Sequence, residues 1–481
     1  MSNRFTGFVR ADGPRLTDGS GAPLLLRGIG LGNWLLPEGY MWKFGDEMSS
    51  PRQIERRVES LVGPGRAADF WAGFRAAFVT EQDVAAIARM GFDHVRLPLN
   101  SRGLVDDDGA FHESGFAHID DLLRWCRDHR LWVLLDLHGA PGGQTGTNID
   151  DSPNGKPELF MDERYRRLTI HLWREIARRY RHDTVVLGYD LLNEPLPNQW
   201  QHIYPRELLA LYHDLTAAIR EIDPDHLIVY EGSHWATNWS IFTDVIDPNS
   251  ALQFHRYWCP PVRSSIQEYL DARDRLGLPI YMGEGGENTP EWIYTMHRLY
   301  EQYEIGWNLW PWKKLDTRTS PVSIDVPDGW GLISDPRARV DPDRAWAILQ
   351  DFLAAVEPPA CRERPEIVNA AFGRPPLRIP SWGFIDESPA FRDRFAGVDG
   401  DVDGDKVWRH YAGQPYTEAE AIPMTVRAGE ELHFALERRP DGWEVEADDP
   451  EAFDILWREG CLVVRATRTT RLRALNLTAT D

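Results

Sequence analysis

The chain has 481 residues, of which 42% are hydrophobic, and a formal net charge of −22 at pH 7. A chain of this length exceeds one typical domain. It holds no run of about eighteen apolar residues, so we expect no membrane-spanning helix. The negative charge argues against a nucleic acid or an anionic membrane as a partner and suits a neutral substrate.

The cysteine spacing and the N-terminal residues indicate in which cellular compartment the protein is expected. Cys126, Cys259, Cys361 and Cys461 are widely spaced and form no Cys-x-x-Cys pair, which argues against a disulfide scaffold or a zinc site. The stretch from Met1 to Gly7 lacks the apolar segment of a secretory signal peptide. We therefore expect a cytoplasmic protein, or a secreted one if a leader has been removed.

The first 79 residues predict a β-hairpin, a first barrel strand and a long connection. Two apolar runs in residues 7–26 flank a turn at Asp18-Gly19-Ser20-Gly21, and the second run continues to Leu31. The segment 33–79 is rich in aromatic residues and predicts a polar helix only near 51–62. A connection of this length is typical of a lid or a pocket wall.

Strands and helices are expected to alternate through the next part of the chain. Strands are expected at 24–31, 92–98, 131–138, 185–192, 226–232, 251–257, 278–284 and 305–312, and helices at 80–90, 115–129, 161–180, 206–222, 264–276, 290–303 and 341–356. This order predicts an α/β fold, a closed (β/α)8 TIM barrel. The alternative is an open doubly wound sheet, but Gly28-Ile-Gly30-Leu-Gly32 has the wrong spacing for its phosphate-binding turn.

The composition shifts to proline between residues 357 and 380, and short β-like runs with turns between them follow to the C-terminus. We therefore expect two domains: a catalytic barrel with its N-terminal hairpin over residues 1–360, and an accessory β-sandwich over 361–481 that the hairpin could complete. Such a sandwich could bind carbohydrate, although packing against the barrel is the more usual role.

Two of the expected strands end on a carboxylate. The run 185–195 closes with Asn193, Glu194 and Pro195, and the run 278–284 closes with Glu284. In a parallel barrel all such ends meet at the rim where chemistry is done. Two carboxylates about 5 Å apart are the minimum equipment for cleaving a glycosidic bond with retention, one as nucleophile and one as acid/base. The alternative, that both merely cap strands or pair with arginines, is weaker for two such residues than for one.

Other strand ends supply supporting groups. Arg96 and Tyr257 could hold Glu284 ionised, and Asn193 is placed to bind a sugar 2-hydroxyl. His138 and His255 could bind sugar hydroxyls or a catalytic carboxylate, and Trp310 could form the floor under the sugar ring.

Each of these residues also has a structural interpretation. Arg96 could be a buried salt-bridge residue, and the two histidines could be core residues or, with a carboxylate, a metal site. The sequence contains neither His-x-His nor His-Glu-x-x-His, so we expect no metal.

The barrel region resembles glycoside hydrolase family 5, the cellulase-type members of a large retaining clan. The matching stretches are Arg27–Trp34, Val95–Pro98, Asp136–Gly142, Leu192–Pro195, His255–Tyr257, Gly283–Glu284 and Gly306–Trp310. The resemblance implies that Glu194 is the acid/base, that Glu284 is the nucleophile and that no cofactor is needed. The supporting residues that it implies are Arg96, His138, Asn193, His255, Tyr257, Trp310 and Trp34.

Within that family the motifs are closest to the exo-β-1,3-glucanase or β-glucosidase-like branch. The shared features are Gly32-Asn33-Trp34, the helix start at Thr80 and the loop 137–142; the chain departs from the branch in its missing signal peptide, its C-terminal domain and its loops 35–79 and 313–335. The resemblance implies action on β-glucosides or small β-gluco-oligosaccharides. A cytoplasmic enzyme meets small glycosides, and long loops can close a cleft into a pocket, so we expect exo action. Alternatives are an exo-β-mannosidase, an arabino- or galactofuranosidase, a glycolipid glycosidase, and a non-catalytic carbohydrate-binding protein.

Overall fold

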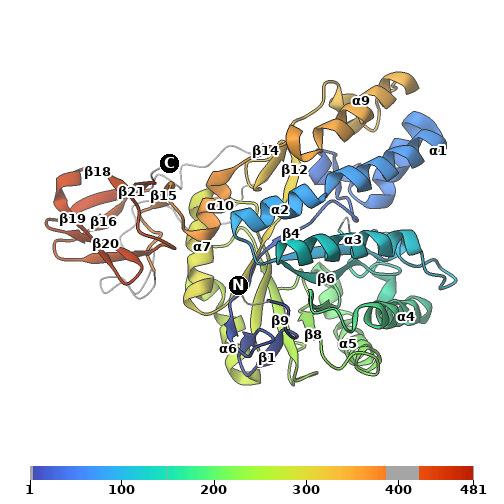
Figure 1. The fold of residues 1–481 in the computed structure, drawn as a ribbon, viewed down its shortest axis with the longest axis horizontal. Helices are drawn as coiled ribbons and strands as arrows, with labels where there is room; N and C mark the ends of the chain where they lie inside the picture. The colour runs from blue at the N-terminus through green and yellow to red at the C-terminus, as the bar shows by residue number, and fades with distance from the viewer. Residues whose placement is uncertain (1–3, 148, 386–421, 480–481) are drawn as a thin grey trace.

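The computed structural model describes residues 4–147, 149–385 and 422–479. At its centre is a closed parallel barrel in which the strands from β4 to β11 follow one another around the ring (Figure 1). The strands are β4 (Arg27–Gly30), β5 (His94–Asn100), β6 (Trp132–Gly139), β7 (Val186–Asp190), β8 (Leu227–Glu231), β9 (Ser250–Arg256), β10 (Ile280–Gly286) and β11 (Gly306–Trp310). The predicted (β/α)8 barrel is confirmed.

Helices cover the outside of the barrel at the expected places. They are α2 (Glu81–Met90), α3 (Glu113–His129), α4 (Glu163–Tyr180), α5 (Pro205–Arg220), α6 (Gln267–Leu276), α7 (Pro290–Gln302) and α9 (Pro342–Ala355). In α3 the buried residues Phe116, Ile119, Leu123 and Cys126 recur every three or four positions and form one apolar face. None of the helices in the described ranges is both long and apolar enough to cross a membrane.

The barrel strands are buried on both faces, which explains their nearly continuous apolar runs. Every residue of β6 is buried, for example. The pairing of β10 with β9 shifts register between Met282 and Glu284. Such a bulge redirects a side chain, and here it falls where the strand presents Glu284.

The N-terminal prediction was wrong in its number of strands. Residues 10–24 form three short antiparallel strands, β1 (Arg10–Asp12), β2 (Arg15–Thr17) and β3 (Pro23–Leu24). The extra turn falls at Gly13, whose φ of 57° is left-handed. The backbone N–H of Ala11 donates to the Asn249 side chain at 3.0 Å, just before β9. The small sheet therefore packs on the barrel, and among the described residues it pairs with no C-terminal strand.

The segment 33–79 is also more ordered than expected. Helix α1 (Pro51–Phe78) has 28 residues and continues beyond a kink at Gly63 and Pro64, where the sequence had suggested an end. Its second half is helical because its aromatic face packs against α9 and Trp42. Figure 1 shows α1 and α9 side by side, reaching away from the barrel.

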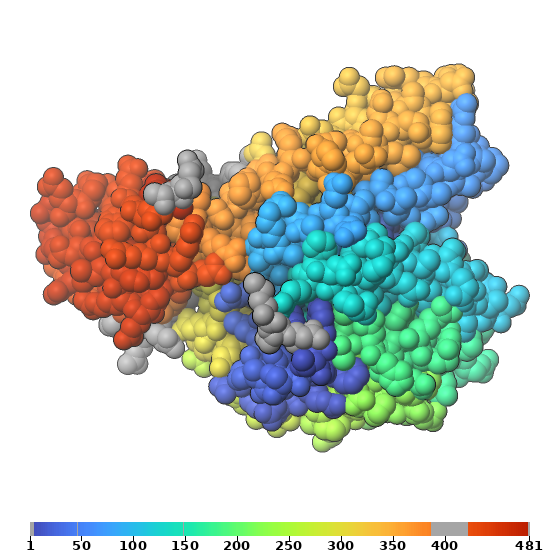
Figure 2. Space-filling model, in the orientation of Figure 1, coloured from blue at the N-terminus to red at the C-terminus, as the bar shows by residue number. Residues whose placement is uncertain are grey.

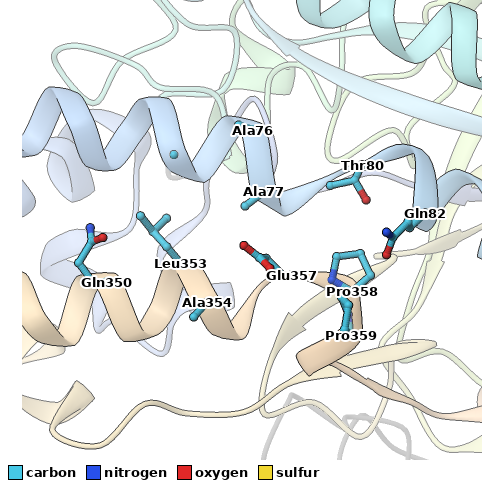
Figure 3. Close-up of a pocket in the computed structure, with 11 residues that line it drawn as sticks. Ala76, Ala77, Thr80, Gln82, Gln350, Leu353, Ala354, Glu357, Pro358 and Pro359 are labelled. Atoms are coloured by element: carbon cyan, nitrogen blue, oxygen red, sulfur yellow. The ribbon is translucent and has the colours of Figure 1, made fainter.

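A hollow of about 560 Å³ lies between these two helices (Figure 3). Ala76, Ala77 and Thr80 face Leu353 and Glu357 across it. It contains none of the residues predicted for catalysis, so the candidate site lies elsewhere.

The C-terminal residues form two antiparallel sheets, consistent with the predicted sandwich, and stand out as a separate lobe (Figure 2). One sheet contains β15 (Leu377–Pro380), β16 (Met424–Val426), β18 (Gly442–Ala447) and β21 (Thr470–Thr478); the other contains β17 (Glu431–Ala435), β19 (Phe453–Arg458) and β20 (Cys461–Ala466). In β17 buried residues alternate with less buried ones, as expected for a strand with one face on a core.

The stretch that joins the lobe to the barrel is not a simple linker. Residues from Pro365 to Phe372 form helix α10, which begins with a proline at its first position and packs on α7. Arg298 of α7 donates to the Ala371 carbonyl at 2.7 Å, and Tyr294 donates to the Ala435 carbonyl at 2.9 Å. Residues just after 360 thus pack with the barrel, and the division at 360/361 stays a prediction.

We predict that Trp42→Ala lowers the free energy of unfolding by about 3–5 kcal/mol. Trp42 is fully buried, and its ring lies 5.0 Å from that of Phe74 and 4.9 Å from that of Phe352. Thermal unfolding of the purified variant measures the loss. Met161→Ala is the control, because Met161 is 48% exposed and should change stability by less than about 0.5 kcal/mol. Equal melting temperatures for both variants would contradict this packing.

Candidate active site

The predicted functional residues gather at the C-terminal ends of the barrel strands. A cavity of about 800 Å³ opens there, and we call it the catalytic cavity. Its wall includes Glu38, Tyr40, His138, Ile149, Glu194, His234, Trp235, Thr237, His255, Arg256, Tyr257, Trp258, Cys259, Glu284, Glu287 and Trp310. Arg96 and Asn193 do not line it but bond to residues that do.

Trp34 is the exception among the predicted residues, because it does not line the catalytic cavity. Its indole N–H donates to the Arg75 carbonyl at 2.8 Å, and its ring packs edge-on against His118. Trp34 therefore lies in the core between the first loop and helices α1 and α3.

The two predicted carboxylates lie close together. Glu194, Glu284 and His255 offer one oxygen or nitrogen each within 4.8 Å of one another. Nδ1 of His255 lies 2.6 Å from Oε1 of Glu194 and 3.7 Å from Oε2 of Glu284. The Tyr257 hydroxyl donates to Oε2 of Glu284 at 3.0 Å. This spacing is close to the separation of about 5 Å between the two carboxyl groups of retaining glycosidases and shorter than that of inverting ones.

Arg96 is the fully buried centre of the polar network under the cavity. Its Nε donates to Asp190 at 2.8 Å, and its Nη1 donates to Glu284. Its Nη2 donates to Oδ1 of Asn193 at 2.8 Å and to Glu231 at 3.0 Å. Both interpretations of Arg96 thus apply at once, because it forms buried salt bridges and also binds Glu284.

The protonation states follow from burial and from these neighbours. Burial alone would lower the pKa of Arg96, but Asp136, Asp190, Glu284 and Glu231 raise it well above its usual value. Burial raises the pKa of Asp136 to about 8 and raises that of Asp190 well above its usual value. Burial also raises the pKa of Glu284, while His255 and Arg96 oppose the shift.

The two histidines of the site carry different charges. Burial lowers the pKa of His138 to about 4, so its ring is neutral. Its Nδ1 lies 2.7 Å from Asp136, and the ring stacks on Trp310 with centroids 5.5 Å apart. Burial would also lower the pKa of His255, but Glu231, Glu284 and a bond to Glu194 raise it well above its usual value.

The group Glu194, His255 and Glu284 also has the spacing of metal ligands. A metal binds neutral imidazole, whereas Glu231, Glu284 and the bond to Glu194 raise the pKa of His255 and favour its protonated form. The residues therefore fit a hydrogen-bonded acid pair better than a metal site. The expectation that the chain needs no metal or cofactor stays a prediction.

Sequence reasoning missed several residues of the site. Glu231 ends an expected strand on a carboxylate, so it carried the same signal as Glu284 and was overlooked. Glu38 and Tyr40 lie in the long connection after β4, where no local pattern marks them. Glu287 lies in the cavity wall with a left-handed φ of 47° and pairs with the buried Lys314.

Glu38 is an unusual group in this wall. Its side chain is buried, and the part of the chain that the structure describes provides it with no hydrogen bond or ion pair. Burial first, and then the neighbouring Glu284, Glu287 and Glu194, raise its pKa well above the usual value. A buried polar group without a partner is costly, so a ligand hydroxyl in the cavity is its natural partner.

A parallel barrel with a close carboxylate pair at its rim is the arrangement of a glycosidase. A family model described as cellulase (glycosyl hydrolase family 5) matches residues 62–316. The chain belongs to this family, and it is a glycoside hydrolase that acts on β-glycosides.

Three curated relatives illustrate the range of the family. A β-xylosidase of Phanerodontia chrysosporium is 29% identical over 363 residues, which cover 66% of this chain and 74% of the relative. Cellodextrinase A of Ruminococcus flavefaciens is 40% identical over 272 residues, 47% of this chain and 76% of the relative. A probable glucan 1,3-beta-glucosidase A of Emericella nidulans is 30% identical over 281 residues, which cover 54% of this chain and 66% of the relative.

One solved structure matches nearly the whole chain. The crystal structure of an endogalactoceramidase is 16% identical with a TM-score of 0.54, and the match covers 98% of this chain and 100% of that one. At this identity the likeness concerns the fold, including the C-terminal sheets.

We predict that Arg96→Met destabilises the protein by about 3–5 kcal/mol at pH 7, because it leaves buried carboxylates without their cation. Burial already raises the pKa values of Asp136, Asp190 and Glu284 while Arg96 lowers them, so loss of the guanidinium should raise these folded-state pKa values further above their unfolded values near 4. Their contribution to stability is then present at low pH and lost as the pH rises. The melting temperature of the Arg96→Met variant should therefore lie further below that of wild type at pH 7 than at pH 5.

The matched control for this experiment is Arg124→Met. Arg124 forms a surface pair with Asp121 in which both side chains are about half exposed, and such a pair contributes little. A deficit of the Arg96 variant that is independent of pH would contradict the charge argument.

Proposed function

We propose that the chain is a retaining β-glycosidase in which Glu284 is the nucleophile and Glu194 the acid/base. We propose further that it is exo-acting on β-glucosides or small β-gluco-oligosaccharides. The observation that carries the mechanism is the closeness of the two carboxylates, whose oxygens lie within 4.8 Å of each other. Inverting enzymes need a wider gap, because a water must fit between carboxylate and sugar.

In the first step Glu284 attacks the anomeric carbon while Glu194 donates its proton to the leaving oxygen. In the second step Glu194 takes a proton from water, which displaces Glu284 and releases the sugar with its original configuration. Arg96 and Tyr257 hold the Glu284 carboxylate in place through one hydrogen bond each. Asn193, fixed by Arg96, is the candidate ligand for the sugar 2-hydroxyl.

The wall that contains Glu38 and Tyr40 supports exo action. The Tyr40 hydroxyl accepts a bond from the Trp310 indole at 3.0 Å, which ties the long connection after β4 to the floor of the cavity. The Glu38 carboxyl has no hydrogen bond or ion pair with the described residues, so it offers a partner to hydroxyls at the non-reducing end of a sugar. We infer from this wall that the cavity is closed at one end and admits a terminal sugar rather than the middle of a polymer.

The names of two relatives support glucose as the sugar, and the name of a third adds a second candidate. Two relatives are a cellodextrinase and a probable glucan 1,3-beta-glucosidase. The β-xylosidase name favours a second candidate, a β-xyloside lacking the 5-hydroxymethyl group. The cytoplasmic location that the sequence suggests stays a prediction and would agree with a small substrate.

We predict that Glu284→Ala and Glu194→Ala each lower turnover of aryl β-glycosides by more than about 10²-fold with the fold intact. With azide and an activated aryl glycoside, the Glu284 variant should give the α-glycosyl azide, because azide replaces the nucleophile. The Glu194 variant should give the β-glycosyl azide, because azide attacks the glycosyl-enzyme. Product anomers are read by NMR, and near-normal turnover of both variants would contradict the proposal.

We predict that the aryl β-glucoside is the best substrate in a panel with β-xyloside, β-mannoside, β-galactoside, arabinofuranoside and galactofuranoside. Values of kcat/KM rank the sugars in the cleaved position. On a soluble β-glucan, reducing ends should appear with little loss of viscosity if action is terminal. A rapid fall of viscosity would contradict exo action. A higher kcat/KM for the β-xyloside would favour the second candidate substrate, a β-xyloside.

A further inference from the structure

Glu231 lies at the end of β8, next to the candidate catalytic pair, and its side chain is fully buried. Its two carboxylate oxygens serve different partners. Oε2 accepts the backbone N–H of Glu194 at 2.7 Å. Oε1 accepts bonds from Arg96 at 3.0 Å and from Gln253, and it lies 3.4 Å from Nε2 of His255.

The bond to the main chain of Glu194 is important because that residue has a left-handed backbone, with a φ of 45°. Residues other than glycine rarely adopt this conformation, and they keep it only where their surroundings enforce it. The carboxylate of Glu231 accepts a hydrogen bond from the backbone N–H of Glu194. It therefore fixes the main chain of Glu194 and, with it, the direction in which the side chain of the acid/base enters the cavity.

A second route from Glu231 to Glu194 runs through His255. The imidazole bridges the two carboxylates, with Nε2 toward Glu231 and Nδ1 2.6 Å from Oε1 of Glu194. Glu231 and Glu284 raise the pKa of His255 against the effect of burial. A raised pKa favours the protonated ring, in which Nδ1–H donates to Glu194.

We propose that Glu231 is a positioning residue that aims Glu194 at the leaving-group oxygen, acting through the main chain of Glu194 and through His255. This inference rests on the proposed function, because Glu194 must be the acid/base. Glu231 also touches Arg96, but Asp190 and Asn193 hold that guanidinium independently. The nucleophile therefore keeps its support when Glu231 is altered.

The first test compares two leaving groups on the same sugar. Phenolate leaves slowly and needs a proton, whereas 2,4-dinitrophenolate needs none. Glu231→Gln keeps the size of the side chain but removes its charge and turns one acceptor into a donor. We expect kcat/KM to fall about 10²-fold for the phenyl β-glucoside and less than about 10-fold for the dinitrophenyl β-glucoside. An equal fall for both substrates would overturn the proposal.

The second test is a double-mutant cycle on the phenyl β-glucoside. If Glu231 acts through Glu194, Glu231→Gln should cost little in a protein that already carries Glu194→Ala. Additive losses would show that Glu231 acts by another route. Failure of the proposed function looks different, because Glu194→Ala alone would then spare the phenyl glucoside or slow both substrates equally.

Tyr212→Phe is the matched control. The Tyr212 hydroxyl donates to the main-chain carbonyl of Glu231 at 2.8 Å and leaves its carboxylate untouched. This variant should keep the wild-type ratio of kcat/KM between the two substrates, and melting temperatures report the folding of every variant. A selective loss on phenyl glucoside from Tyr212→Phe would trace the effect to packing around β8 and refute the role of the carboxylate.

Discussion

The face of the barrel that carries the chemistry depends on one buried guanidinium. Arg96 projects from β5 and binds Asp190 at the end of β7, Glu231 of β8 and Glu284 of β10. A buried cation is tolerated only with counter-charges at hydrogen-bond distance. Each carboxylate therefore has one acceptable position, and the strand ends are fixed relative to one another. The parallel strands bring these carboxylates to the same rim of the barrel, and the Arg96 side chain fixes their positions relative to one another.

The main-chain strain at this rim follows from the same network. Glu194 and Glu287 both have left-handed φ angles, of 45° and 47°, and both face the cavity. Glu194 is held by the Glu231 carboxylate and Glu287 by Lys314. Strained residues persist where the surroundings over-determine them. The buried ionic contacts therefore do more than satisfy charges, since they maintain conformations that local sequence would not choose.

The barrel and the meeting of the two carboxylates at its rim could be predicted from the sequence because the signals were local. Apolar runs that end on Glu194 and Glu284 gave both the strands and the carboxylates. Other features had no local signal in the sequence. Glu38 lies in the cavity wall but belongs to the long connection after β4. The length of α1 depends on contacts with α9 that form only in the folded protein. Gly63 and Pro64 looked like a helix end, yet tertiary packing continued the helix past the kink. Trp34 sat in a matching motif but belongs to the core.

The surroundings of the two carboxylates differ in a way that supports the roles proposed for them. Glu284 receives hydrogen bonds from Arg96 and Tyr257 and has His255 3.7 Å away. Glu194 has His255 as its side-chain partner and depends on Glu231 only through its backbone. Donors and cations favour the ionised form of a carboxylate. Burial raises the pKa of Glu284, and its donors and cations oppose that shift, which suits a nucleophile because it must be an anion. Glu194 has fewer such neighbours, which suits the group that gives a proton away and later takes one back.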